Sequence, residues 1–147
     1  MLYGDNMQEV FNYEKRYWYP HLTQDHITIW EKFITQFPNV YDYVQYDLEI
    51  GQVPEFVTSH PDKSMQGQAN LYQRKIDVVG FKGDQIDLIE IKPHAGLSSL
   101  GQINGYKALY QRDFNPPVVP KAIVITDQTD QDTTHAAYAQ NVTIIVV

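Results

Sequence analysis

The sequence predicts an α/β fold in which a mixed central β-sheet is flanked by helices. Two apolar runs, at residues 74–82 and 85–91, are separated by a Gly-Asp pair that is typical of a tight hairpin. Downstream of this hairpin, helix and strand patterns alternate, which predicts parallel pairing with right-handed crossovers. An amphipathic helix pattern precedes the strands. The length of 147 residues suits one domain with one core, spanning 1–147.

The first part of the chain combines an aromatic-rich segment with a helix. Residues 1–20 form an N-terminal extension, for which we expect a short helix around residues 8–17. A second helix is predicted at about 23–36, because apolar residues recur there at helical spacing. Pro38 ends that pattern, since proline is not compatible with a helix interior.

A strand and a long loop are predicted next. Residues 40–50 alternate between a mostly apolar face and a polar face, which carries Asp47 and Glu49. Both acids are expected to be solvent-exposed. Residues 51–73 form a long polar loop, and loops of this length are often functional flaps or mobile segments.

The second half of the chain supplies the remaining elements. The strand at 85–91 is almost continuously apolar, as in a central strand covered on both faces. The elements expected after it are a helix at 98–113, a buried strand at 121–126, a short helix at 131–140 and a last strand at 142–147.

Composition limits the function classes. The chain has no cysteine, which excludes disulfides and thiolate metal sites. No apolar run is long enough for a membrane span, and the N-terminus lacks signal-peptide features, so we expect a cytoplasmic protein without membrane association. The net charge is −7, yet residues 74–112 carry six basic and four acidic residues. A locally basic segment on an acidic body suits a small site that faces phosphate.

The hairpin register brings two acids together. If Gly83 and Asp84 form the two-residue loop, Asp77 lies directly opposite Glu90 and Lys75 lies opposite Lys92. Side chains opposite each other across a strand pair are roughly 5 Å apart at Cβ. Like charges at that distance destabilise a sheet, unless a cation lies between them. The alternative is an ordinary hairpin with solvated polar residues.

These residues have the chemistry of a Mg²⁺ or Mn²⁺ site. Mg²⁺ is usually held by one or two carboxylates together with water and phosphate oxygens. Asp77 and Glu90 would be ligands, and the backbone carbonyl of Ile91 could add a third. Lys92 could orient or deprotonate the attacking water, or stabilise charge on the phosphorane.

This pattern resembles that of the PD-(D/E)xK nucleases, which have the restriction-endonuclease-like fold. The residues that carry the resemblance are Asp77 and the Glu90-Ile91-Lys92 element on the next strand, together with the order of elements from about 23 to 126. The residue before Asp77 is Ile76, where the family motif has proline. The resemblance implies a metal-dependent nuclease that hydrolyses phosphodiester bonds.

Three further positions fit this family. Gln102 and Tyr106 form a Gln-x-x-x-Tyr pair on the following helix, as in several exonuclease-like members. They would support a metal-bound water or the phosphate; packing and helix-surface polarity are the alternative. Glu31 stands where many members carry an additional metal-binding acid, although a solvated helix face explains it equally well.

The leading functional hypothesis is therefore a Mg²⁺-dependent deoxyribonuclease acting on DNA, branched or single-stranded DNA included. RNA is a lesser variant. The small core favours a homodimer or structure-selective cutting over monomeric sequence reading. A catalytically inactive binding or assembly module with the same fold is the alternative. The tyrosines Tyr41, Tyr43 and Tyr46 could stack on bases or pack in the core. His21 and His26 are expected to be structural, and His94 is expected to be a loop histidine, with contact to a phosphate as the alternative.

Overall fold

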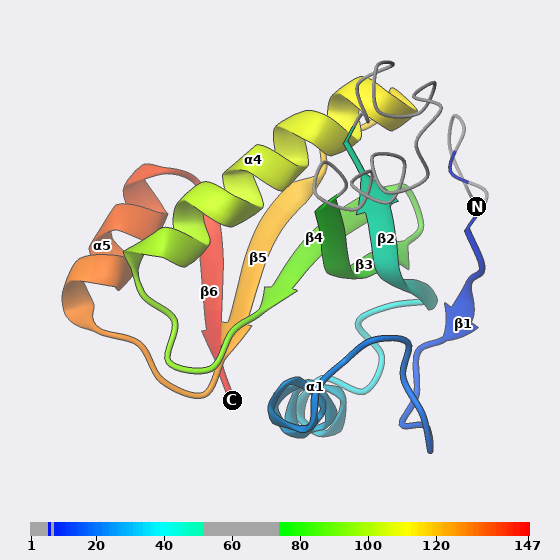
Figure 1. The fold of residues 1–147 in the computed structure, drawn as a ribbon, viewed down its shortest axis with the longest axis horizontal. Helices are drawn as coiled ribbons and strands as arrows, with labels where there is room; N and C mark the ends of the chain where they lie inside the picture. The colour runs from blue at the N-terminus through cyan, green and yellow to red at the C-terminus, as the bar shows by residue number, and fades with distance from the viewer. Residues whose placement is uncertain (1–5, 7, 52–73) are drawn as a thin grey trace, which may run out of the picture.

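The chain forms a six-stranded mixed sheet whose strands lie in chain order (Figure 1). The computed structural model describes residues 6, 8–51 and 74–147. Neighbours from β1 to β4 are antiparallel, whereas β5 and β6 continue the sheet in parallel with β4. The strands are β1 (Phe11–Asn12), β2 (Tyr43–Ile50), β3 (Arg74–Lys82), β4 (Gln85–Ile91), β5 (Lys121–Thr126) and β6 (Val142–Val146).

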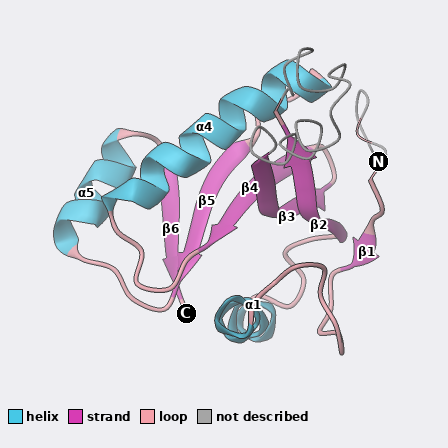
Figure 2. Cartoon of the chain, in the orientation of Figure 1, coloured by secondary structure: helices cyan, strands magenta, loops and turns pink. Residues whose placement is uncertain are grey.

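Helices cover both faces of this sheet (Figure 2). Helix α1 (Gln24–Gln36) lies against one face, and α4 (Leu97–Phe114) and α5 (Gln131–Ala139) lie against the other. Parallel strands need a crossover connection, and α4 and α5 are those crossovers. The predicted mixed sheet flanked by helices is confirmed. Within the described part of the chain, no helix has both the length and the apolar character needed to cross a membrane.

The hairpin between β3 and β4 matches its prediction in both bounds and register. Lys82 pairs with Gln85, so Gly83 and Asp84 form the two-residue loop. Gly83 has φ +54°. A positive φ at the first loop position, and not at the second, is the feature of the predicted type II′ turn.

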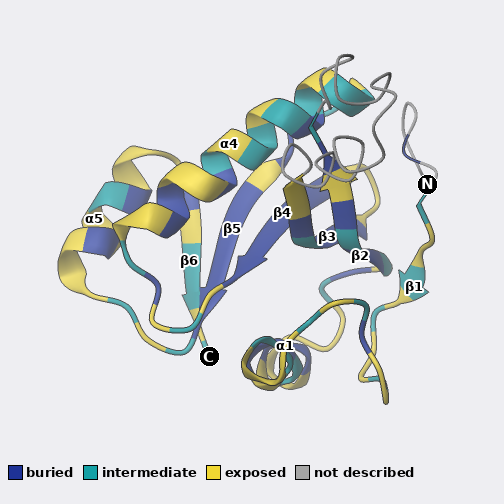
Figure 3. Ribbon diagram, viewed as in Figure 1, coloured by how far each residue is buried: buried dark blue, intermediate teal, exposed yellow. Residues whose placement is uncertain are grey.

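Two apolar cores sandwich the central strands. One core lies between the sheet and helices α4 and α5, and it includes Leu88 and Ile103. The other lies between the sheet and α1, and it includes Ile89 and Trp30. Strand β4 contributes to both and is buried from its second residue to its last, as Figure 3 shows in dark blue. A polar side chain on β4 is therefore held away from water.

The N-terminal extension differs from its prediction. The expected helix around residues 8–17 is wrong, because the segment is extended and pairs through β1 with the edge of β2. A reciprocal amide pair anchors it: the Asn6 side chain donates to Gln45 Oε1 at 2.7 Å, and Gln45 donates back at 2.9 Å. Two aromatic residues of this segment, Phe11 and Tyr13, pack against Tyr46 of β2 and Trp30 of α1.

Strand β2 begins later than predicted and changes face midway. The expected single apolar face is wrong: Val44 and Tyr46 point to the α1 side, whereas Leu48 and Ile50 point to the α4 side. The change occurs at Asp47, whose φ is +54°. The predicted loop at residues 51–73 lies outside the described residues, apart from Gly51.

A close contact at Gly80 joins β3 to a buried polar pair. The Tyr41 hydroxyl donates to Asp87 Oδ2 at 2.7 Å, and both residues are buried. The Tyr41 ring lies against Gly80, where an added Cβ would be only 2.5 Å from the nearest ring carbon. The absence of a side chain at this position is what allows the ring to reach Asp87.

We expect Gly80→Ala to destabilise the protein by about 1–3 kcal/mol, because the Tyr41 ring must move and overpacking costs that much. Urea denaturation measures the difference. Gly101→Ala is the matched control, since a Cβ there meets open space. On a helix that change should stabilise by up to about 1 kcal/mol. Equal stability of the two variants would contradict this account of Gly80.

Candidate active site

The site lies where β3 separates from β4. The ladder is regular as far as the pair of Val78 with Ile89. The next pair in this register would join Asp77 and Glu90, but the ladder stops there. Instead, Asp77 Oδ2 accepts a hydrogen bond from the Ile91 amide at 2.9 Å. The carboxyl groups of Asp77 and Glu90 hydrogen-bond to each other. The predicted proximity of the two acids is therefore present.

Burial forces this pair to hold a proton. Glu90 is only 6% exposed. Burial, and then the negative charge of Asp77, raise the pKa of Glu90 to about 8 against the partial relief that Lys92 provides. Burial also raises the pKa of Asp77, although the Ile91 amide and His26 oppose the shift. At neutral pH and without a cation, protonated Glu90 thus donates to the Asp77 carboxylate.

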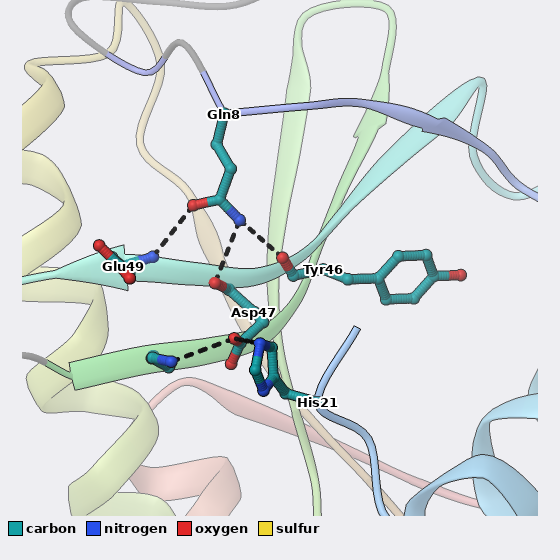
Figure 4. A network of polar contacts seen from close by, with 6 residues as sticks. Gln8, His21, Tyr46, Asp47 and Glu49 are labelled. Carbon is teal, nitrogen blue, oxygen red and sulfur yellow. Dashed lines mark hydrogen bonds and ion pairs between the residues drawn. The ribbon is translucent and has the colours of Figure 1, made fainter. Parts of the chain in front are cut away.

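A third acid faces the pair from β2. The pairs Tyr46–Val78 and Leu48–Ile76 flank the position at which Asp47 stands opposite Asp77. Asp47 was predicted to be exposed, but its side chain is only 15% exposed. Its carboxylate lies 3.3 Å from Lys75 Nζ. His21 Nε2 lies 3.6 Å away on the same carboxylate, as Figure 4 shows. The charge of Asp47 helps to raise the pKa of Asp77.

The two lysines of the hairpin therefore differ from the prediction. Lys75 was expected opposite Lys92, but β3 has left β4 at that point, and Lys75 pairs with Asp47 instead. Lys92 lies just beyond β4, and its exposed side chain acts on Glu90 by lowering its pKa. Lys92 thus offsets part of the negative charge at Glu90.

The backbone of Ile91 also faces this edge. The Lys92 amide donates to the Ile125 carbonyl at 3.0 Å, so the Lys92 N–H points toward β5. The Ile91 amide points the other way, to Asp77. In a strand, the N–H and C=O of one residue point to the same side. The Ile91 carbonyl is therefore directed toward the edge that Asp77 and Glu90 occupy.

Helix α4 brings the predicted Gln-x-x-x-Tyr pair to the same place. The Gln102 amide donates to the Tyr106 hydroxyl at 2.8 Å. The Tyr106 ring packs against the core between α4 and the sheet. Burial raises the pKa of Tyr106, and the charges of Glu90 and Asp77 raise it further. The hydroxyl therefore lies within electrostatic reach of both acids.

The structure does not bring Glu31 to this group. Its carboxylate accepts a hydrogen bond from the Tyr19 hydroxyl at 2.7 Å, beside Lys15 and Lys32. Over residues 6, 8–51 and 74–147, no three acidic or histidine side chains converge as metal ligands. Two carboxylates and a carbonyl are what this site offers.

The tyrosines and histidines that the sequence analysis considered either pack in the core or make contacts that were not predicted. Tyr41 and Tyr46 are buried, and Tyr43 stacks on Phe81 at a centroid distance of 4.8 Å, so these tyrosines are part of the core. His21 and His26 were expected to be structural only. The structure places His21 on Asp47 and His26 near Asp77. Both histidines lie outside the β3–β4 hairpin, the part of the chain whose register could be counted from the sequence, so these contacts could not be predicted.

Comparison with known proteins bears on the fold. No protein-family model matches the chain, and neither does any curated protein. The structure is similar to a repair endonuclease from Pyrococcus abyssi, with 13% identity, a TM-score of 0.50 and coverage of 88% of this chain and 48% of that one. It is similar to EndoMS in a complex with double-stranded DNA, with 13% identity, a TM-score of 0.50 and coverage of 91% and 48%.

A protein of unknown function, AF1548, is also similar, with 12% identity, a TM-score of 0.50 and coverage of 82% of this chain and 55% of that one. The chain thus spans about half the length of the solved structures that it matches. The chain has a restriction-endonuclease-like fold.

Proposed function

We propose that this protein is a metal-dependent nuclease that hydrolyses phosphodiester bonds in DNA. The observation that carries the proposal is the pair of half-buried Asp77 and buried Glu90 beside Lys92, in which the Ile91 amide holds Asp77. Two adjacent acids removed from water destabilise a fold, and acids with strongly shifted pKa values cluster at functional sites. A repair endonuclease and a DNA-bound EndoMS among the proteins of similar fold support DNA as the substrate.

The residues present fit Mg²⁺ or Mn²⁺. Asp77 and Glu90 would hold the ion with the carbonyl of Ile91, and water and phosphate oxygens would complete the shell, as is usual for Mg²⁺. The raised pKa of Glu90 means that its proton must leave before it can act as a ligand. When bound, such an ion polarises the phosphate and lowers the pKa of a coordinated water.

The remaining groups would act on the water and the phosphate. The Lys92 ammonium lies on the solvent side of the pair, where it can orient the attacking water and stabilise the charge that develops on phosphorus oxygens. The Gln102 amide fixes the Tyr106 hydroxyl, whose proton remains free to donate. Tyr106 would thereby position a water or a phosphate oxygen. Burial on β4 keeps Glu90 fixed for this arrangement.

Cleavage of DNA tests the proposal directly. We expect Mn²⁺-dependent cleavage of at least one of single-stranded, duplex and branched DNA. Asp77→Asn, Glu90→Gln and Lys92→Met should each lower the rate about 100-fold or more, because each removes a group that acts in the transition state. Tyr106→Phe should have a smaller effect. The exposed turn variant Asp84→Asn is the control and should cut like wild type. No cleavage of any substrate, with Glu90→Gln indistinguishable from wild type, would refute the proposal.

Thermal denaturation separates an active metal site from an inactive module. We expect Mn²⁺ at about 100 times its Kd to stabilise the fold by about 2.7 kcal/mol, which raises Tm. The shift should disappear in Asp77→Asn and persist in Asp84→Asn. A Tm that does not respond to Mn²⁺, in a protein that still folds, would favour the binding or assembly module.

The shared proton predicts an unusual pH dependence in EDTA. The pKa of Glu90 is about 8 in the folded protein against an ordinary value of 4.5, so the folded state binds the extra proton between these values. The stability it contributes is full below pH 4.5 and is lost as pH rises through 8. Relative to Glu90→Gln, wild type should lose up to about 1.4 kcal/mol per pH unit.

Urea denaturation at several pH values measures this difference. Asp84→Asn, which changes an exposed acid of the same hairpin, should follow the wild-type curve. Parallel curves for wild type and Glu90→Gln would show that Glu90 titrates normally in the folded protein.

A further inference from the structure

A pocket of about 300 Å³ lies over β2, next to the acidic residues of the site. Two aromatic residues that precede α1, Phe11 and Trp18, line the pocket, and we call them its rim. The polar residues His21, Asp47 and Lys75 also line it, and we call them its floor. This volume is at the lower end of the range for small-molecule sites. None of these residues has a role in the proposed hydrolysis.

The rim carries an unusually exposed aromatic side chain. Trp18 is 66% exposed, whereas Trp30, the second of the two tryptophans, is fully buried. Tyr17 is also exposed, and so is Lys15. Exposed aromatic side chains beside basic ones are the arrangement with which proteins bind single-stranded nucleic acid, because bases stack on the rings and phosphates meet the cations.

The floor is held rigid by strained backbone and by polar contacts. His21 and Asp47 both have a left-handed backbone, with φ of +55° and +54°. The Gln8 side chain donates to the carbonyls of Tyr46 and Asp47, at 2.7 Å and 3.1 Å, which fixes this part of β2 (Figure 4). Strain of this kind persists only where the surrounding contacts over-determine it, and it clusters at functional sites.

The charge of the pocket favours a base over a phosphate. The lysine and the histidine that line it, Lys75 and His21, both contact the Asp47 carboxylate, at 3.3 Å and 3.6 Å. A phosphate would have to compete with Asp47 for these cations. The exocyclic amino group of a nucleobase is instead a hydrogen-bond donor that a carboxylate accepts. The aromatic rim supplies the stacking surface for the same ring.

The position of the pocket ties it to the acid pair. Asp47 forms part of the floor and stands opposite Asp77 in the β2–β3 register. Neighbouring strands lie roughly 4.8 Å apart. A base on this floor would therefore belong to a nucleotide close to the phosphate at Asp77 and Glu90.

We propose that this pocket binds an unpaired nucleobase of DNA, stacked on Trp18 and hydrogen-bonded to the floor, beside the phosphate that is cut. The inference rests on the proposed nuclease function and gives it a substrate class, namely DNA with unpaired nucleotides at the cleavage site. A fully paired duplex would have to extrude a base to fill the pocket, at a cost of a few kcal/mol.

Tryptophan fluorescence tests the proposal, because Trp18 is the exposed tryptophan and Trp30 is buried. A short single-stranded oligonucleotide of mixed sequence, titrated in EDTA, should quench the emission. The duplex of the same sequence should quench it much less at equal concentration. In Trp18→Phe the oligonucleotide should still bind by fluorescence anisotropy, but the emission change should be lost.

Affinity measurements supply the second readout. Trp18→Leu should weaken single-strand binding about ten-fold, the typical loss for one stacked base. Tyr138→Leu is the matched control, since Tyr138 is an 87% exposed aromatic on α5, and it should bind like wild type. A single strand that does not bind, or that binds without changing the emission, overturns the proposal. So does a Trp18→Leu variant with wild-type affinity.

These outcomes are separate from those of the cleavage experiment. The titration contains no metal and requires no hydrolysis. A protein that cuts DNA without Trp18 quenching keeps the proposed nuclease function and loses the base pocket. Quenching without cleavage would retain the pocket and refute the hydrolysis.

Discussion

The site depends on one hydrogen bond: where β3 leaves β4, a side-chain carboxylate accepts from a β4 amide in place of a backbone carbonyl. The Ile91 amide would be an unsatisfied buried donor once the ladder ends, and Asp77 Oδ2 satisfies it. This bond fixes the Asp77 side chain beside Glu90. Burial and the Asp77 charge then raise the pKa of Glu90 to about 8. The end of the ladder therefore brings the two acids together, and their proximity contributes to the raised pKa of Glu90.

Such a pair requires a sheet that is covered on both faces. Strand β4 lies between the α1-side core and the α4-side core, so Glu90 has no route to bulk water along most of its surface. The two faces also contribute different groups. Helix α4 presents Tyr106 to the pair, and α1 presents His26 to Asp77. A single-layer hairpin would leave both acids solvated and with ordinary acidity.

Short-range geometry was predictable from the sequence and long-range geometry was not. The two-residue turn at Gly83 fixes the β3–β4 register, so the approach of Asp77 to Glu90 could be counted residue by residue. The β2–β3 connection is long, and its length leaves the register open, so Asp47 could not be placed opposite Asp77. The helix expected at 8–17 was wrong because residue spacing alone does not show that the edge of β2 needs a partner.

The strained residue Asp47 explains why two acids, and not three, come together at this end of the sheet. Three carboxylates in a row across β2, β3 and β4 would repel one another strongly in this buried region. The left-handed backbone at Asp47 coincides with the point at which β2 changes face, and its carboxylate is compensated there by Lys75 and His21. The third charge is thereby neutralised without joining the pair of Asp77 and Glu90. The same contacts form the polar floor beneath Trp18, so the device that relieves repulsion at the acid pair also shapes the pocket beside it.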